Sequence, residues 1–307
     1  MMKLGIIGMS PGNAHPYSWS AIVNGCFDAE EIRRIGYPAV ANYLEANQST
    51  LGISGVKVTH VWAQDESIAG SIAKTARIDH VCNSPEEMAG RVDAVFLSRD
   101  DAENHVKMAQ PFIDAGIPLF IDKPVALTLT DLDYFSNEYA KGKLIMSCSS
   151  MRYAGECMVV KQEMDSFGKI ELVTAVGKKD WNKYGVHLLE ALSALLDDPR
   201  PVTVKHIGVA GKDIVHITFE TGVQAVFQLF TDISPTFQLS LFGQNGWRLI
   251  DIKNSYSMFR DNIIEFVRSV EDGKPRLPFE KTEQIIRALI AANESLHNGG
   301  KTVILTR

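Results

Sequence analysis

The sequence predicts an α/β protein with two domains: an N-terminal Rossmann-type doubly wound parallel sheet and a C-terminal α+β domain with an open, mostly antiparallel sheet. A chain of 307 residues is long enough for two well-filled cores. In the first half, apolar runs alternate with amphipathic helical patterns, which is typical of a parallel sheet covered on both faces. After about residue 150, apolar runs separated by turn residues favour an antiparallel sheet with one solvated face. We therefore predict domains at residues 1–148 and 149–307.

Composition excludes several functional classes. A net charge of −6 and a sequence pI of about 5.8 argue against a general nucleic-acid-binding surface. The four cysteines contain no C-x-x-C pair, so we expect neither a disulfide framework nor a metal site. The apolar start "MMKLGIIGM" is too short for a signal peptide, and no apolar run reaches membrane length. We expect a cytoplasmic protein that binds no nucleic acid and no membrane.

The first domain is predicted to alternate strands with helices. The helix after the first strand begins near Pro16 and ends before Gly25, and a later one ends at Gly116. A further helix has Thr130 as its N-cap and ends at Gly142. The predicted strands cover residues 3–8, 56–63, 92–98, 118–122 and 143–150, and the other helical patterns cover residues 67–76 and 103–116.

The second domain is predicted to contain five strands framed by helices and a short final strand. The apolar alternation and the turn residues between the runs carry this prediction. The predicted strands cover residues 170–177, 202–210, 213–222, 223–230, 236–246 and 301–306, and the helices cover residues 186–197, 257–273 and 280–300.

The connection between the first helix and the second strand of the first domain is unusually long. About thirty residues, roughly 26–55, separate Gly25 from the strand that starts at Val56, where a short connection is usual. Residues 39–47, "AVANYLEAN", predict an extra helix there. We interpret the segment as an insertion that forms a lid or an oligomer contact.

The stretch "GIIGMSPGNAHPYSW" begins like a dinucleotide-binding strand and turn and then departs from the pattern. The first glycine of G-x-G-x-x-G is Gly8, but the second and third positions hold Ser10 and Asn13. Judged by these residues alone, a pyrophosphate-binding turn and an ordinary exit from a strand are equally supported.

Two further stretches contain candidate catalytic side chains. Lys123 in "PLFIDKPVALT" directly follows a buried strand, at the sheet edge where open α/β sheets bind ligands. His187 in "YGVHLLEAL" lies at the predicted start of a helix, so we expect a neutral imidazole that can accept a proton. Judged singly, Lys123 could be a solvated residue at a strand end, and His187 could be a core histidine.

Several motifs in order resemble one family over nearly the whole chain. They are the glycine turn, "IDKPVALT", "SSMRY", "YGVHLLEAL" and the closing helical segment. This order is similar to that of the glucose–fructose oxidoreductase/inositol dehydrogenase (Gfo/Idh/MocA) family. The resemblance implies a Rossmann domain followed by an open-sheet domain, and NAD or NADP as cofactor. It also implies oxidation or reduction of a carbinol carbon in a sugar, polyol or nucleotide sugar, at a site between the domains.

The resemblance also implies roles for individual residues. Lys123 and His187 take the catalytic positions, with His187 as acid/base and Lys123 near the reacting hydroxyl. Arg152, Lys183, Trp181 and Tyr184 are expected to bind substrate. The cofactor-binding set is expected to comprise Gly8, Ser10, Gly12, Asn13, His15, Asp65, Ser98, Arg99, Asp122 and Lys123.

The chain departs from the family pattern at several of these positions. Asp122 stands where glutamate is usual, and Lys183 stands where an acid precedes the histidine by four residues. Arg99 and Asp100 replace a threonine and a proline. Strand two ends at Ala63 instead of an acid, and no basic residue follows it directly, so we prefer NAD over NADP because Asp65 would repel a 2′-phosphate.

Two functional hypotheses remain open. The first is an NAD(P)-dependent oxidoreductase that acts on a sugar, sugar acid or nucleotide sugar. A basic loop with Lys178, Lys179 and Lys183 suggests that the substrate carries an anionic group. Arg152 is the best candidate to bind that group through two parallel hydrogen bonds from its guanidinium. Repulsion from Lys183 would also favour the neutral His187 imidazole.

The second hypothesis is an inactive NAD(P)-binding regulatory or partner-binding protein on the same fold. For either, we expect a homodimer or homotetramer formed through the C-terminal sheet.

Overall fold

The computed structural model describes residues 1–305, which divide into two compact units. The first unit comprises Met1–Val125, Asp133–Ser147 and Phe259–Phe279. The second comprises Ala126–Leu132, Cys148–Met258 and the segment that starts at Glu280. The sequence-based division assigned residues 259–279 to the second domain, whereas the structure assigns them to the first unit.

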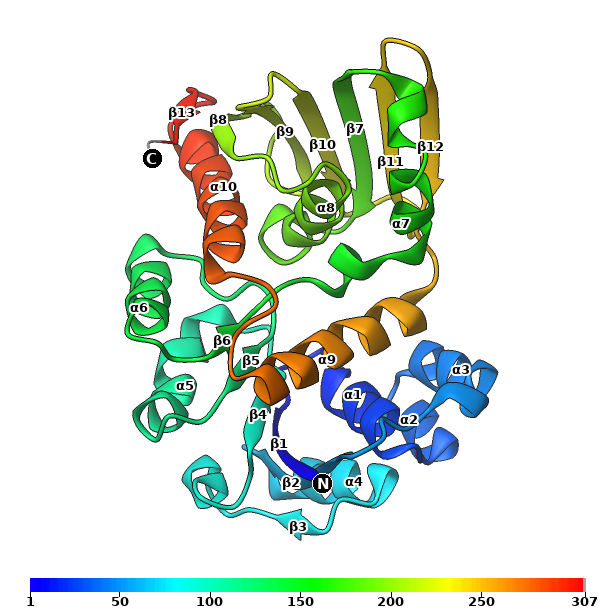
Figure 1. The fold of residues 1–307 in the computed structure, drawn as a ribbon, viewed down its shortest axis with the longest axis vertical. Helices are drawn as coiled ribbons and strands as arrows, with labels where there is room; N and C mark the ends of the chain where they lie inside the picture. Colours follow the sequence, from blue (N-terminus) through cyan, green and yellow to red (C-terminus); the bar gives the residue numbers. More distant parts are fainter. Residues whose placement is uncertain (306–307) are drawn as a thin grey trace. The chain divides into compact units, whose positions relative to one another are not determined.

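The first unit is built on a parallel sheet, as predicted, but with six strands because the sequence analysis missed β3 (Figure 1). Its strand order is β3-β2-β1-β4-β5-β6. Strands β2 and β3 are added on one side of β1, and the later strands are added on the other side, beginning with β4. Open α/β sheets bind ligands at the carboxyl ends of the strands beside such a reversal. The strands are β1 Met2–Gly8, β2 Val56–Ala63, β3 His80–Val81, β4 Ala94–Leu97, β5 Leu119–Ile121 and β6 Ile145–Met146.

Helices of the first unit follow the predicted pattern at most of their ends. Pro16 lies in the first turn of α1, and Gly25 ends that helix with a φ of 72°. One predicted cap was wrong: the Thr128 hydroxyl, rather than Thr130, accepts the Asp131 N–H, so α6 starts at Leu129. The helices are α1 His15–Asn24, α2 Ala29–Arg34, α3 Pro38–Ala46, α4 Glu66–Ala76, α5 His105–Asp114 and α6 Leu129–Ala140, with α9 Ser255–Asp272 contributing from Phe259 onward.

The second unit contains a seven-stranded mixed sheet in the order β12-β11-β7-β10-β9-β8-β13. All its strand pairs are antiparallel except β7 with β10, which is parallel. The strands are β7 Ile170–Lys178, β8 Pro201–His206, β9 Lys212–Phe219, β10 Gln224–Phe230, β11 Phe237–Gly243, β12 Trp247–Asp251 and β13 Val303–Ile304. The sequence reasoning missed β12, and Thr306 of the predicted final strand lies outside the described residues.

In the central strands β9 and β10, side chains alternate between a buried face and a more exposed face. In β10, Ala225, Phe227 and Leu229 are buried, whereas the residues between them are half-exposed. Helix α8, Trp181–Leu195, lies across the buried face (Figure 1). The other helices with residues in this unit are α7 Gly155–Lys161 and α10 Phe279–His297. Among the described residues, the structure has no helix long and apolar enough to cross a membrane.

Candidate active site

The turn after β1 has the backbone features that a dinucleotide-binding turn requires. A Cβ at Gly8 would lie 2.3 Å from Cγ of Pro16, so only glycine allows α1 to approach the strand this closely. Gly12 has a φ of 81°, in the left-handed region that favours glycine. The turn leads into α1, whose first N–H groups attract anions. These features fit a bound pyrophosphate.

The polar side chains of the turn are engaged by the protein itself. The Ser10 hydroxyl donates to Oδ1 of Asp100 at 2.5 Å and accepts the Asp100 N–H. Asn13 donates through Nδ2 to Asp122 and accepts the His15 N–H. Sequence reasoning expected Ser10, Asn13 and His15 to donate directly to the cofactor, but each of these residues has an internal partner.

Asp122 links this turn to the end of β5. Its Oδ2 lies 2.5 Å from Nδ1 of His15 and 2.8 Å from Nδ2 of Asn13, and its Oδ1 accepts the Lys123 N–H. Burial alone would raise the pKa of the Asp122 carboxyl, but His15, Lys123 and Asn13 together hold that pKa well below its usual range. The shorter aspartate thus provides a buried anion that joins the glycine turn to the strand before Lys123.

Lys123 lies where the sequence predicted, directly after the strand residues of β5. Its residue is 6% exposed, which is uncommon for lysine and indicates a constrained side chain instead of a solvated one. The solvated interpretation of Lys123 is therefore wrong.

Arg99 reaches from the end of β4 across β1 to the end of β2. It donates through Nη1 to Oε1 of Gln64 and forms an ion pair with Asp101. Gln64, which also donates to the Met9 carbonyl oxygen, was missed by sequence reasoning, although it directly follows β2. Ser98 is fully buried and donates to the Ile7 carbonyl oxygen, so its hydroxyl connects two strands.

Asp65 has a structural role at the start of α4. Its Oδ1 accepts hydrogen bonds from N–H and hydroxyl of Ser67, at 2.8 and 2.6 Å. Asp65 is thus the N-cap of this helix. The expectation that it binds the adenosine ribose gains no support from this geometry.

The insertion packs beside the glycine turn. Its helix α3 packs against α1, and Asn47 at the end of α3 donates to the Tyr43 carbonyl oxygen. Tyr43 in α3 donates to Ser18 of α1 at 2.5 Å. The sequence placed this insertion near the turn, and the Tyr43–Ser18 contact joins it to the helix that follows the turn.

In the second unit, His187 is held by the hydroxyl of Ser149. The Ser149 Oγ lies 2.6 Å from Nδ1 of His187, and the same oxygen accepts the Met151 N–H. Helix α8 begins at Trp181, so His187 is its seventh residue. The influence of a helix N-terminus is confined to the first turn, so it does not reach His187 as the sequence analysis supposed.

Aromatic side chains connect His187 to a cavity of about 510 Å³ in the second unit. The ring centroids of Tyr184 and Phe237 lie 5.2 and 5.8 Å from that of His187, and both residues line the cavity. Nζ of Lys179 lies 2.5 Å from the Tyr184 hydroxyl. The cavity is lined by Lys178, Lys179, Tyr184, Pro235, Thr236, Phe237, Asp251, Ile252 and Lys253.

Arg152 is a buried structural cation, whereas the sequence analysis expected it to bind an anionic group of the substrate. Its Nε donates to Glu190 at 2.6 Å and its Nη2 donates to Asp198 at 2.7 Å. Burial opposes its charge, but the two carboxylates raise the pKa of Arg152 above its usual value. Glu190 also accepts the Ser149 N–H. Arg152 therefore stabilises the segment that presents Ser149 to His187.

Two other expected substrate ligands have different positions in the structure. Trp181 is buried, donates through Nε1 to the Leu289 carbonyl oxygen and packs edge-on against Phe227, so it is a core residue. Lys183 is exposed on the first turn of α8, and its N–H is capped by Asp180. The lysines that line the described cavity are Lys178, Lys179 and Lys253.

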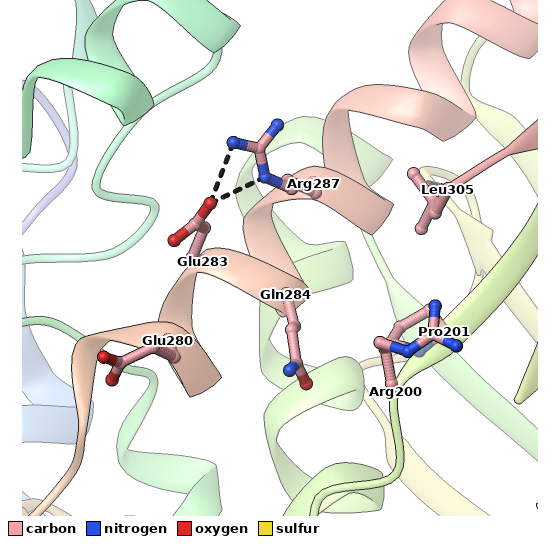
Figure 2. Close-up of a pocket in the computed structure, with 7 residues that line it drawn as sticks. All are labelled: Arg200, Pro201, Glu280, Glu283, Gln284, Arg287 and Leu305. Atoms are coloured by element: carbon pink, nitrogen blue, oxygen red, sulfur yellow. Dashed lines mark hydrogen bonds and ion pairs between the residues drawn. The ribbon is translucent and has the colours of Figure 1, made fainter. Parts of the chain in front are cut away.

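A second cavity in this unit, between the start of α10 and β8, is a weaker candidate (Figure 2). Its volume is about 180 Å³, below the range usual for ligand pockets. Glu283 accepts from Arg287 across one side of it (Figure 2), and Arg200 pairs with Glu220. Its lining residues are Arg200, Pro201, Glu280, Glu283, Gln284, Arg287 and Leu305.

The strand order and the glycine turn give the first unit a Rossmann-type fold, and comparison with known proteins shows which family model matches part of it. Residues 32–149 match the Gfo/Idh/MocA family, described as an oxidoreductase family with an NAD-binding Rossmann fold. Inositol 2-dehydrogenase 1 of Saccharopolyspora erythraea is 31% identical over 107 residues. That alignment covers 34% of this chain and 32% of the relative. Residues 32–149 are thus similar to the NAD-binding Rossmann domain of the Gfo/Idh/MocA family, and the chain spans about a third of the length of the curated relative it matches.

Solved structures share the fold of the whole chain. A probable dehydrogenase from Thermotoga maritima has a TM-score of 0.79 at 14% identity, with 99% of this chain and 98% of that chain covered. The scyllo-inositol dehydrogenase from Lactobacillus casei, solved with NAD(H) and scyllo-inositol, has a TM-score of 0.77 at 14% identity, with 99% of each chain covered. At these identities the likeness establishes the fold, and the predicted fold class is confirmed.

Proposed function

We propose that the protein is an NAD(P)-dependent oxidoreductase that acts on a carbinol carbon of a sugar derivative. The observation that carries this proposal is the setting of His187, whose Nδ1 contacts Ser149 while its ring adjoins two aromatic residues of the cavity. An Nδ1–H donated to Ser149 leaves Nε2 as the basic nitrogen of the ring. Nε2 is then suited to take a proton from a substrate hydroxyl.

Each partner in the reaction has a separate role. The nicotinamide, when bound, accepts or supplies the hydride. Lys123, constrained at the end of β5, donates a hydrogen bond to the oxygen on which negative charge develops. Gly8 and Gly12 shape the turn that holds the pyrophosphate, and Asp122 holds that turn in place.

The substrate class proposed here is an anionic sugar derivative, such as a sugar acid or a nucleotide sugar. Lysines at 178, 179 and 253 line the cavity, against one carboxylate, Asp251, which pairs with Lys253 at 2.5 Å. Lys179 has a φ of 79°, a conformation that costs a non-glycine residue on the order of 1 kcal/mol and often marks a functional position. A cavity of about 510 Å³ fits a ligand of this size.

Equilibrium binding tests this substrate class. A sugar acid should bind more tightly than its neutral counterpart, and the difference should shrink as salt rises because charge attraction is screened. Lys179→Asn, which keeps a residue tolerant of positive φ, should remove most of the preference. The exposed Lys205→Ala is the matched control and should leave it unchanged. Equal binding of neutral and anionic ligands by the unchanged protein would refute the anionic class.

The alternative is a protein that binds the dinucleotide without turnover, and the exposed Lys183 in place of the family's acid favours it. The two are separated by assay: a regulator binds NADH but reduces no carbonyl. We prefer the enzyme, because Ser149 supplies a polar partner to His187 without that acid.

Self-association through the second unit is also proposed. The face of the sheet opposite α8 carries half-exposed apolar residues, among them Val176 and Val226. A second copy covering this face would bury them. Light scattering should give a dimer or tetramer, and Val226→Lys should shift it toward the monomer. A monomer at micromolar concentration would refute this part.

A further inference from the structure

A buried histidine bridges the two chain segments that leave β4 and β5. His105 is the first residue of α5 and is fully buried. Its Nδ1 lies 3.0 Å from the Val125 carbonyl oxygen, and its Nε2 lies 2.8 Å from the Arg99 carbonyl oxygen. A neutral imidazole donates through one nitrogen and a doubly protonated imidazole through both, so at least one of these contacts is an N–H···O hydrogen bond.

This bridge acts where the pairing of the two strands has ended. The register of β4 with β5 ends at Leu97 and Ile121. Arg99 and Val125 lie beyond these residues, in the segments that follow the two strands. Buried backbone carbonyl groups need hydrogen-bond partners, and here the His105 ring takes the place that a neighbouring strand has within the sheet.

The bridge also anchors the segment that carries Lys123. On the strand side, the Asp122 carboxylate accepts the Lys123 N–H at 2.8 Å. On the other side, Pro124 has no N–H to donate, and the next residue, Val125, is held through its carbonyl oxygen by His105. Lys123 is thus fixed between two anchored residues, both of which are buried.

We propose that His105 is a positioning residue for Lys123 and acts through the backbone of Val125. The inference rests on the proposed function, in which Lys123 donates a hydrogen bond to the reacting oxygen. A displacement of about 1 Å at a reacting group can lower a rate about a hundredfold, so an anchor this near to Lys123 controls its reactivity. His105 itself contacts neither substrate nor cofactor in this role.

A double-mutant cycle separates positioning from general stability. His105→Gln should lower kcat about tenfold in the unchanged protein but cause no further loss in Lys123→Ala, where no ammonium remains to be positioned. The amide nitrogen of asparagine takes roughly the place of Nδ1, which contacts Val125, whereas that of glutamine takes roughly the place of Nε2. His105→Asn should therefore retain more of kcat than His105→Gln.

Asn24→Ala is the matched control for the loss of a bridge. The Asn24 side chain also donates to two backbone carbonyl oxygens of the first unit, those of Val58 and Ala76. Removing it should lower the melting temperature, because buried carbonyl groups lose their partner, and should leave kcat unchanged.

Chemical labelling provides a readout that needs no turnover. The rate at which Lys123 reacts with an amine reagent is followed by peptide mass spectrometry, with the exposed Lys205 as internal reference. His105→Gln should raise the labelling of Lys123 severalfold relative to Lys205, because a buried amine reacts when its segment opens. Asn24→Ala should leave this ratio unchanged.

Three outcomes would overturn the inference. Normal kcat in His105→Gln would show that the bridge does not control Lys123. An equal loss of kcat in the unchanged and Lys123→Ala backgrounds, or an equal loss in Asn24→Ala, would assign the effect to general stability. If the unchanged protein turns over no substrate, the proposed function fails by itself, and unchanged labelling of Lys123 in His105→Gln would then overturn the positioning role separately.

Discussion

The Oγ of Ser149 lies 2.6 Å from Nδ1 of His187, although 38 residues separate the two in the chain. Ser149 is itself held in place by two contacts. Its hydroxyl accepts the Met151 N–H, and its own backbone N–H interacts with the Glu190 carboxylate. This contact orients the imidazole, and the account of catalysis depends on the tautomer in which Nδ1–H donates to Ser149.

Ser149→Ala should lower kcat about tenfold while leaving Kd for NADH unchanged, because the base loses its orientation and the cofactor site is untouched. Ser149→Thr, which keeps the hydroxyl, should recover part of the loss. Steady-state kinetics beside a NADH titration provide the measurement. Ser166→Ala, at an exposed helix-end serine, is the control. A normal kcat in Ser149→Ala would show that the contact is incidental.

His187→Ala and Lys123→Ala should each lower kcat on the order of a hundredfold with the fold retained, since each removes a group proposed to act on the reacting oxygen. Circular dichroism and thermal melting check the fold. The exposed His297→Ala and Lys205→Ala serve as matched controls. Near-normal kcat in both test variants would place the chemistry elsewhere.

Arg152→Ala should destabilise the protein by about 3–5 kcal/mol, because removing one partner leaves Glu190 and Asp198 buried without their cation. Chemical denaturation measures the change. Arg248→Ala breaks an exposed pair with Glu163 and should cost about 1 kcal/mol or less. If the Arg152→Ala variant kept its stability and lost its preference for anionic ligands, the result would support direct binding of the substrate by Arg152.

The buried Asp122 carboxylate should make stability fall in acid. Its pKa is depressed in the folded protein, so its contribution is fully present above its ordinary unfolded pKa of about 4 and is lost as pH falls toward the folded value. Asp122→Asn should cost on the order of 2 kcal/mol at neutral pH, because His15 and Asn13 lose a charged acceptor. It should also flatten the decline in unfolding free energy below pH 4, measured by denaturation at several pH values. An equally steep decline in the variant would assign the acid sensitivity to other carboxylates.

The sequence predicted what local patterns determine. Apolar periodicity located the strands of both sheets except β3 and β12, and Lys123 followed from its place after a buried strand. Motif order suggested the family resemblance and His187. Long-range partners were beyond this reasoning: Arg152 looked like a substrate ligand because Glu190 and Asp198, its buried partners, lie 38 and 46 residues away. Ser149 and Gln64 were not singled out from the sequence, and only the folded chain brings them to His187 and Arg99.

The central claim is tested most directly by incubating the unchanged protein with NAD⁺ or NADP⁺ and a matched set of neutral polyols, sugar acids and nucleotide sugars. The absorbance of the reduced nicotinamide is followed over time. The account predicts substrate-dependent reduction, with NAD⁺ preferred over NADP⁺ and with kcat/KM higher for the anionic substrates than for their neutral counterparts. Tight binding of NADH without turnover of any substrate in the set would contradict it and favour the regulatory alternative.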